Sequence, residues 1–202
     1  MNSAMHAYER LSLHQTGIVF GILLIVGHAL LLFRAECAQK FLVSFPRNQK
    51  IGQIILGIGF LWFWLLIAPE GKGWVSSLAM DMTEFNAVKP WLRLLMPVLF
   101  VLVAYSIKEF LSVRALGLLG LLIAEVLFRA SDLKDPETRL LVPIWTYGLV
   151  ICSLFWVGMP YMFRDAVTWA TASQSRWKAL CVGGIAYGVA VLTCAILFWK
   201  GY

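Results

Sequence analysis

Long uninterrupted runs of apolar residues alternate with short polar segments along this chain. A transmembrane helix needs about 20 largely apolar residues. Continuous runs favour helices, because the strands of a membrane barrel alternate in polarity over about ten residues. The pattern therefore predicts an all-α, polytopic helical membrane protein with about six transmembrane helices in a single membrane domain. The spans are expected at residues 16–33, 51–67, 91–107, 113–130, 140–162 and 180–199.

The longest polar interval, residues 68–90, has a helical pattern of its own. Trp74, Leu78, Met82 and Phe85 follow one another at spacings of four, four and three residues, which places them on one helical face. This predicts an interfacial amphipathic helix between the second and third spans, with Trp74 at the lipid interface. A lid over a central cavity and a docking surface for a partner are the alternatives for the same segment.

Composition supports a membrane location. Of the 202 residues, 60% are hydrophobic and 14% charged, and the mean hydropathy is +0.79. Soluble domains average about 25% charged residues, and disordered chains are poor in aromatic ones, so both classes are excluded. The formal net charge of +6 comes from basic residues between the apolar runs. We therefore expect the lipid bilayer, and not nucleic acid, as a partner.

The distribution of basic residues hardly distinguishes the two sides of the membrane. Eight Lys and Arg residues fall on the side of the N-terminus and nine on the other side. The first loop alone holds four of the nine, and the first helix usually dominates topology. We expect both termini outside a bacterial-type inner or plasma membrane. Arg47, Lys50 and Arg164, on the side away from the termini, are expected at lipid headgroups or at the interface.

The fourth span and its C-terminal edge carry four charged residues. Such a residue costs roughly 2.5–3.5 kcal/mol near a helix centre and therefore suggests a function. At 100° per residue, Arg114, Glu125, Arg129 and Asp132 lie close together around the fourth span. This charged stripe is a candidate intramembrane polar site for a proton, an ion or a substrate. The alternative is that Glu125 pairs with Arg129 and both side chains reach toward the nearer interface.

His28, near the end of the first span, is a further candidate for this polar site. His14 lies on nearly the same face, a spacing that two haems could use, but the chain has only one other histidine to complete their ligation. We therefore expect no cofactor and a hydrogen-bonded His28 inside the bundle. Metal-ligand and nucleophile motifs are lacking, so no metal site and no catalytic residue is predicted. Polar residues at span rims, such as Arg93 and Tyr147, are expected to join helices or anchor them.

Small residues predict which helices approach closely. Gly17 and Gly21 in the first span, and Gly184 and Gly188 in the sixth, are each separated by three residues. Such pairs let two helix backbones approach. The first and sixth helices are therefore expected to contact one another.

These features favour a non-enzymatic subunit or assembly component of a membrane complex. Few polar groups converge, and the loops are too short for a soluble catalytic site. The expected partner is a membrane protein or a second copy of the chain. A small transporter or channel using the stripe around Glu125 is the first alternative. A membrane-embedded lipid-modifying enzyme, with Arg47, Lys50 and Arg164 at the headgroups, is the second.

Overall fold

Long apolar helices make up most of the described part of the protein. The computed structural model describes residues 11–68, 78–80, 83–106 and 109–202. Within these residues, six helices are long and apolar enough to cross a membrane. They are α1 (Leu13–Phe33), α3 (Gln49–Leu66), α5 (Lys89–Ser106), α6 (Leu111–Ser131), α7 (Leu141–Gly158) and α9 (Gln174–Leu197). The prediction of an all-α, multi-pass membrane protein is confirmed.

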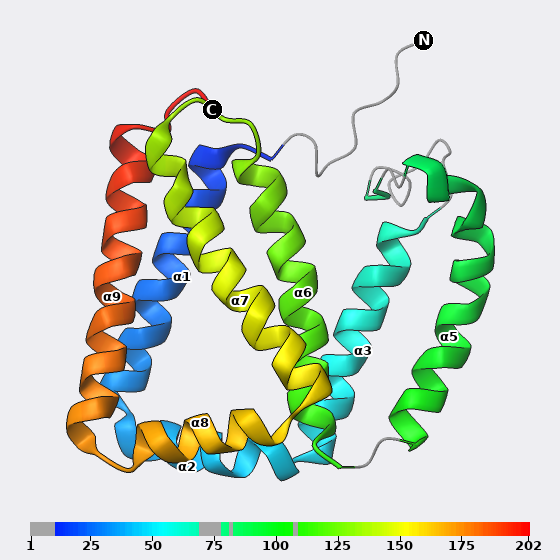
Figure 1. Ribbon diagram of the computed structural model, residues 1–202, viewed down its shortest axis with the longest axis horizontal. Helices are drawn as coiled ribbons and strands as arrows, with labels where there is room; N and C mark the ends of the chain where they lie inside the picture. Colours follow the sequence, from blue (N-terminus) through cyan, green and yellow to red (C-terminus); the bar gives the residue numbers. More distant parts are fainter. Residues whose placement is uncertain (1–10, 69–77, 81–82, 107–108) are drawn as a thin grey trace.

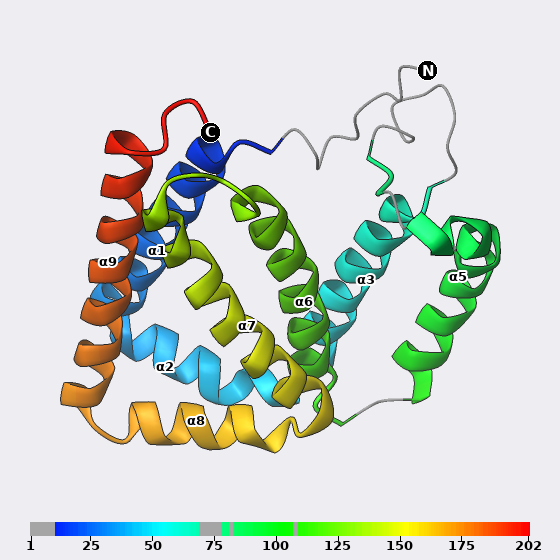
Figure 2. The ribbon, with the colours of Figure 1, turned by 45° about the horizontal axis from the view of Figure 1, so that its top comes forward.

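Two shorter helices, α2 (Ala35–Ser44) and α8 (Tyr161–Thr171), lie across one end of the bundle. Helix α2 connects α1 with α3, and α8 connects α7 with α9, so both lie crosswise to the spans (Figures 1 and 2). We call this side the α2/α8 end. On α8, Phe163 is buried while Arg164 and Asp165 are exposed, as expected for a helix in the interface plane. Neither helix was expected from the sequence.

The start of α1 and the C-terminus lie together at the opposite end, which we call the terminal end. The His14 backbone N–H donates to the Tyr202 carbonyl at 3.3 Å, and the Ser12 hydroxyl donates to the same oxygen at 2.6 Å. An even number of spans places both ends of the chain on one side. These bonds close the α1–α9 pair at that side.

Local signals explain two of the helix boundaries. The Asn48 side chain accepts from the Ile51 N–H at 3.1 Å and caps α3. Helix α7 ends at Gly158 instead of the predicted residue 162, because Pro160 is the N-cap of α8 and begins a new helix there. The last span begins earlier than predicted, at Gln174 instead of residue 180.

The interfacial helix expected in residues 68–90 falls largely on residues 69–77 and 81–82, outside the described part of the chain, and so does Trp74. In the described part, Leu78–Met80 is not helical and Thr83–Val88 forms the 3₁₀ helix η3. The expected α-helix is therefore wrong for these two pieces. The helices that lie crosswise to the spans are instead α2 and α8.

The bundle is densest around α6 and loosest around α5. Buried residues of α1, α6, α7 and α9 share one core, which includes Phe20, Leu127, Val142 and Val191, and Trp199 just after α9 joins it. At the α2/α8 end, Phe45, Val113 and Phe163 form a second core, and the Ser112 hydroxyl donates to the Phe45 carbonyl at 2.6 Å. Helix α5 packs mainly on α3 and stands at the edge of the molecule (Figure 1).

Candidate functional site

The charged residues of α6 occupy two separate places along its length. Arg114 lies in the first turn at the α2/α8 end, and Glu125 follows eleven residues later, about 16 Å along the axis. Leu118 and Leu121 lie between them on the same face and line an apolar cavity against α3. The stripe therefore does not form one continuous polar surface.

Glu125, Arg129 and Asp132 meet at the terminal end. Together with residues at the start of α7 they line a pocket of about 460 Å³, which we call the α6–α7 pocket. Its lining residues are Glu125, Phe128, Arg129, Ser131, Asp132, Leu133, Arg139, Leu140, Pro143 and Tyr147. Two carboxylates and two guanidinium groups therefore face one small space.

Two residues that line the α6–α7 pocket form an ion pair. The Arg129 Nε donates to Glu125 Oε1 at 2.6 Å, four residues apart on one helix, and the side chains are 31% and 42% exposed. Glu125 lies six residues before the end of α6, about 9 Å from that end. The pair is consequently near the membrane edge and partly open to its surroundings. This geometry matches the local pairing that the sequence offered as an alternative.

An aromatic pair forms one wall of the same pocket. The ring of Phe128 on α6 meets that of Tyr147 on α7 edge to face, with centroids 4.9 Å apart. Tyr147 is exposed, so its ring also faces outward from the bundle. The pocket thus combines a half-exposed ion pair with an exposed aromatic surface.

Arg114 belongs to a different environment. It lies between two buried residues, Val113 of the second core and Ala115, which packs with Leu56 and Leu111. Its Nε is buried, and within the described residues no hydrogen-bond partner for it is found. Arg114 therefore does not act together with Glu125 in this conformation.

His28 is also remote from the α6–α7 pocket. Its Nδ1 lies 2.8 Å from the Leu24 carbonyl of its own helix, and its ring packs on Gly184 of α9. The His14 Nδ1 instead reaches across to α9, where it lies 2.7 Å from the Ala195 carbonyl. Both histidines thus join polar backbone groups in or beside the α1–α9 contact.

The four predicted packing glycines lie in that same contact. An added Cβ on Gly17 would meet the Trp199 ring, and one on Gly184 would overlap the His28 ring. Gly21 and Gly188 face each other, since a Cβ on either would lie 3.1 Å from the carbonyl of the other. The backbones of α1 and α9 therefore approach so closely that side chains are excluded.

The residues predicted at lipid headgroups lie around the α2/α8 end. Arg47 belongs to the 3₁₀ helix η2 (Phe45–Arg47), Lys50 to the first turn of α3 and Arg164 to α8, and all three are exposed. Arg164 pairs with Asp165 at 2.9 Å. Between α2 and α8 lies a cavity of about 540 Å³, lined by Gln39, Lys40, Val43, Ser44, Arg47 and Thr171.

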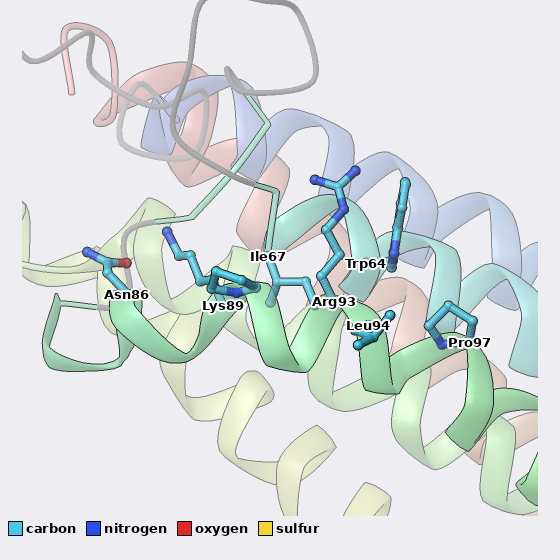
Figure 3. A pocket seen from close by; sticks show the side chains of 8 residues that line it. Trp64, Ile67, Asn86, Lys89, Arg93, Leu94 and Pro97 are labelled. Carbon is cyan, nitrogen blue, oxygen red and sulfur yellow. The ribbon is translucent and has the colours of Figure 1, made fainter.

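One cavity was not predicted. Trp64 on α3 and Lys89 and Arg93 on α5 line a space of about 640 Å³ near the terminal end (Figure 3). The signal available in the sequence was the spacing of two cations four residues apart at the start of a span. Their position opposite Trp64 depends on how α3 and α5 pack.

Metal-ligand geometry and similarity to known proteins give no further information about the site. Among the described residues, no group of three His, Cys, Asp or Glu side chains is arranged to hold a metal ion. No family model, curated protein or solved structure matches the chain. The function is therefore inferred from the protein's own geometry.

Proposed function

We propose that this multi-pass membrane protein is a non-enzymatic component of a membrane complex and binds a partner membrane protein at the α6–α7 pocket. The observation that supports this most is the half-exposed Glu125–Arg129 pair near the edge of the membrane. A charge pair that is only partly covered by its own chain can accept polar groups from another one. A helix end or loop of a second protein could supply them.

The surroundings of the pair suit a protein partner. Arg139 and Asp132 add a second charge of each sign, so the pocket can both donate and accept charge-assisted hydrogen bonds. Exposed Tyr147 supplies a large ring with a polar tip, and tyrosine is enriched where proteins bind one another. An aromatic anchor beside complementary charges is a common arrangement at interaction hot spots.

The interrupted stripe argues against the transporter alternative. A transport path needs polar groups or water along the whole span. Between Arg114 and Glu125, the corresponding face of α6 carries Leu118 and Leu121, which line an apolar cavity. Glu125 therefore serves a site at one membrane edge better than a path through the bilayer.

Cross-linking in native membranes tests the proposed partner site. A photoreactive amino acid in place of Tyr147 should capture one protein in stoichiometric amounts, and the same protein should co-purify after mild solubilisation. Glu125→Gln should lower its recovery more than tenfold, because breaking a hydrogen-bonded charge pair at an interface typically costs about 2–5 kcal/mol. Glu109→Gln, an exposed carboxylate near the α2/α8 end, is the matched control and should leave recovery unchanged.

Other results would point elsewhere. Cross-links between two differently tagged copies of the chain would identify a homo-oligomer as the complex. Ion or solute flux in proteoliposomes that is lost in Glu125→Gln, without any captured protein, would contradict the proposal and support a transporter. Recovery that is equal in Glu125→Gln and Glu109→Gln would exclude this pocket as the partner site.

We also propose that the α2/α8 end faces the cytoplasm, so that both termini are outside. Support comes from the four basic residues between α1 and the second turn of α3, on a layer of in-plane helices suited to anionic lipid. Cys37 on α2 is exposed and reports this side directly. A membrane-impermeant maleimide should label Cys37 in inverted vesicles and not in intact cells, with Cys37→Ser as the control. Labelling in intact cells would reverse the orientation.

A further inference from the structure

The cleft between α3 and α5 has an open cavity at its terminal end. Its volume of about 640 Å³ is within the range of about 300–1,000 Å³ that small-ligand pockets occupy. The lining residues are Trp64, Ile67, Asn86, Lys89, Pro90, Arg93, Leu94 and Pro97. The cavity is thus built from the end of α3, the start of α5 and the turn before it.

Two cations form the polar part of this cavity. Lys89 and Arg93 are four residues apart on α5 and rise from the same side of the helix (Figure 3). Lys89 is only 3% exposed, and the guanidinium carbon of Arg93 lies 3.9 Å from the centroid of the Trp64 ring. Among the described lining residues the other polar side chain is Asn86, and none is acidic. The lining therefore favours an anion.

The cavity continues as an apolar cleft along the span. A second space of about 400 Å³ shares Trp64 and Pro97 with the first. Its other lining residues are Gly57, Phe60, Leu61, Met96 and Phe100, all without charge. From Trp64 to Gly57 the cleft extends about 10 Å along α3. A third space of about 300 Å³ shares Phe60 and Met96 with the second and reaches α6.

Glycine keeps this cleft open. A Cβ on Gly59 would meet no atom within 4 Å, and one on Gly57 would meet only the Phe100 ring, at 3.9 Å. These glycines therefore leave unfilled space instead of permitting backbone contact. Pro97 adds a polar feature, because it has no N–H to donate to the carbonyl of Arg93 four residues earlier.

We propose that the α3–α5 cleft binds one anionic glycerophospholipid of the bilayer, with its phosphate beside Lys89 and Arg93 and one acyl chain along Gly57 and Met96. An anionic headgroup complements the positive charge of Lys89 and Arg93 at the mouth of the cleft. The apolar acyl chain joined to it suits the apolar lining further along the cleft. The mouth lies at the start of a span, where headgroups are found. A zwitterionic lipid adds a cationic group next to two cations and therefore binds more weakly.

Native mass spectrometry of the full chain in mild detergent measures this binding. One phosphatidylglycerol per protein is expected, with at least fivefold lower occupancy by phosphatidylcholine of the same acyl chains. Arg93→Gln should lower phosphatidylglycerol occupancy about fivefold, the contribution typical of one basic residue beside an anionic lipid. Arg176→Gln is the matched control, because Arg176 also lies over a tryptophan, Trp169, but at the α2/α8 end.

A second pair of variants tests whether an acyl chain occupies the cleft. Gly57→Leu should fill the cleft and lower phosphatidylglycerol occupancy severalfold, while the unfolding temperature of the lipid-free protein stays unchanged. Gly183→Leu on α9 also adds a side chain where no atom lies within 4 Å, and it should not affect lipid binding. Millimolar inorganic phosphate should not displace the lipid; displacement would indicate a site for free phosphate and overturn the proposal.

Equal occupancy by the two lipids, or unchanged occupancy in both Arg93→Gln and Gly57→Leu, would also overturn it. If either variant fails to insert into the membrane, photo-cross-linking of lipid to the wild-type protein still tests the proposal. Phosphatidylglycerol with a photoreactive group in the middle of one acyl chain should cross-link to peptides of α3 and α5. Cross-links distributed over the other spans would contradict the assignment.

Discussion

The helix pairs α1–α9 and α3–α5 use glycine in opposite ways. In α1–α9, an added Cβ at Gly17, Gly21, Gly184 or Gly188 would meet atoms of the facing helix. In α3–α5, the space beside Gly57 and Gly59 is open. The first pair is therefore held by close packing, and the second retains a cleft. Glycine thus permits close helix contact in one region and leaves a cavity open in the other.

Polar bonds reinforce this difference. At one end of the α1–α9 pair, the Trp177 indole donates to the Leu31 carbonyl at 3.1 Å, and at the other the chain terminus bonds back to Ser12. Between α3 and α5, Arg93 stacks on Trp64, and the rings of Phe60 and Phe100 lie with their centroids 5.4 Å apart. We infer that α1–α9 supplies stability, while α3–α5 tolerates change and is suited to a ligand.

Filling the α1–α9 contact should have the largest effect on stability. In Gly17→Val, the new Cβ would lie 2.6 Å from Cε3 of the fully buried Trp199, so the helices must separate. Overpacking of this kind typically costs about 1–3 kcal/mol. Thermal unfolding in detergent measures the loss, and Gly27→Val on the same helix, with open space around it, should cause none. Equal unfolding temperatures for the two variants would contradict close packing.

Removing one hydrogen bond from the same region should have an intermediate effect. The Trp199 indole donates to the Thr138 hydroxyl at 2.9 Å. Trp199→Phe should cost about 1–2 kcal/mol, because it deletes the donor and leaves a partly buried acceptor. Chemical unfolding compares it with Trp91→Phe, whose side chain is 73% exposed and should be replaceable without loss. If Trp91→Phe is equally destabilised, burial does not explain the result.

The smallest effect is expected in the α3–α5 pair. Trp64→Leu removes the aromatic face beneath Arg93, a cation–π contact that contributes about 0.5–1 kcal/mol at partly exposed sites. A double-mutant cycle with Arg93→Gln measures the coupling between the two side chains by chemical unfolding. A coupling larger than the loss in Trp199→Phe would reverse the order of stability assigned to the two regions.

For the candidate polar site, the sequence predicted the angular positions of the residues around the helix axis but not their depth in the membrane. The angular positions of Arg114, Glu125, Arg129 and Asp132 follow from the helical repeat, and so does the pairing of Glu125 with Arg129. How deep each residue lies depends on where α6 begins and ends. The helix extends to Ser131, which places the Glu125–Arg129 pair near one edge and leaves Arg114 at the other.

The helices α2 and α8 could not be recognised by the criteria that found the spans. Each has only ten or eleven residues and includes charged side chains, so hydropathy alone does not separate it from a loop. Their apolar residues gain partners at the α2/α8 end, where Leu42 of α2 and Phe163 of α8 pack in one core with Val113 of α6. The contact that stabilises them joins segments far apart in the chain.

By itself, the sequence determined that this protein crosses a membrane several times as helices, because the length of an apolar run compared with the thickness of a bilayer is a local property. It also determined which residues share a helix face, since the helical repeat is fixed. Only the tertiary structure decided that α1 and α9 close against each other while α3 and α5 leave a cleft with Lys89 and Arg93 at its mouth. The reason is physical: contact and cavity depend on the space between non-local side chains, which no single segment specifies.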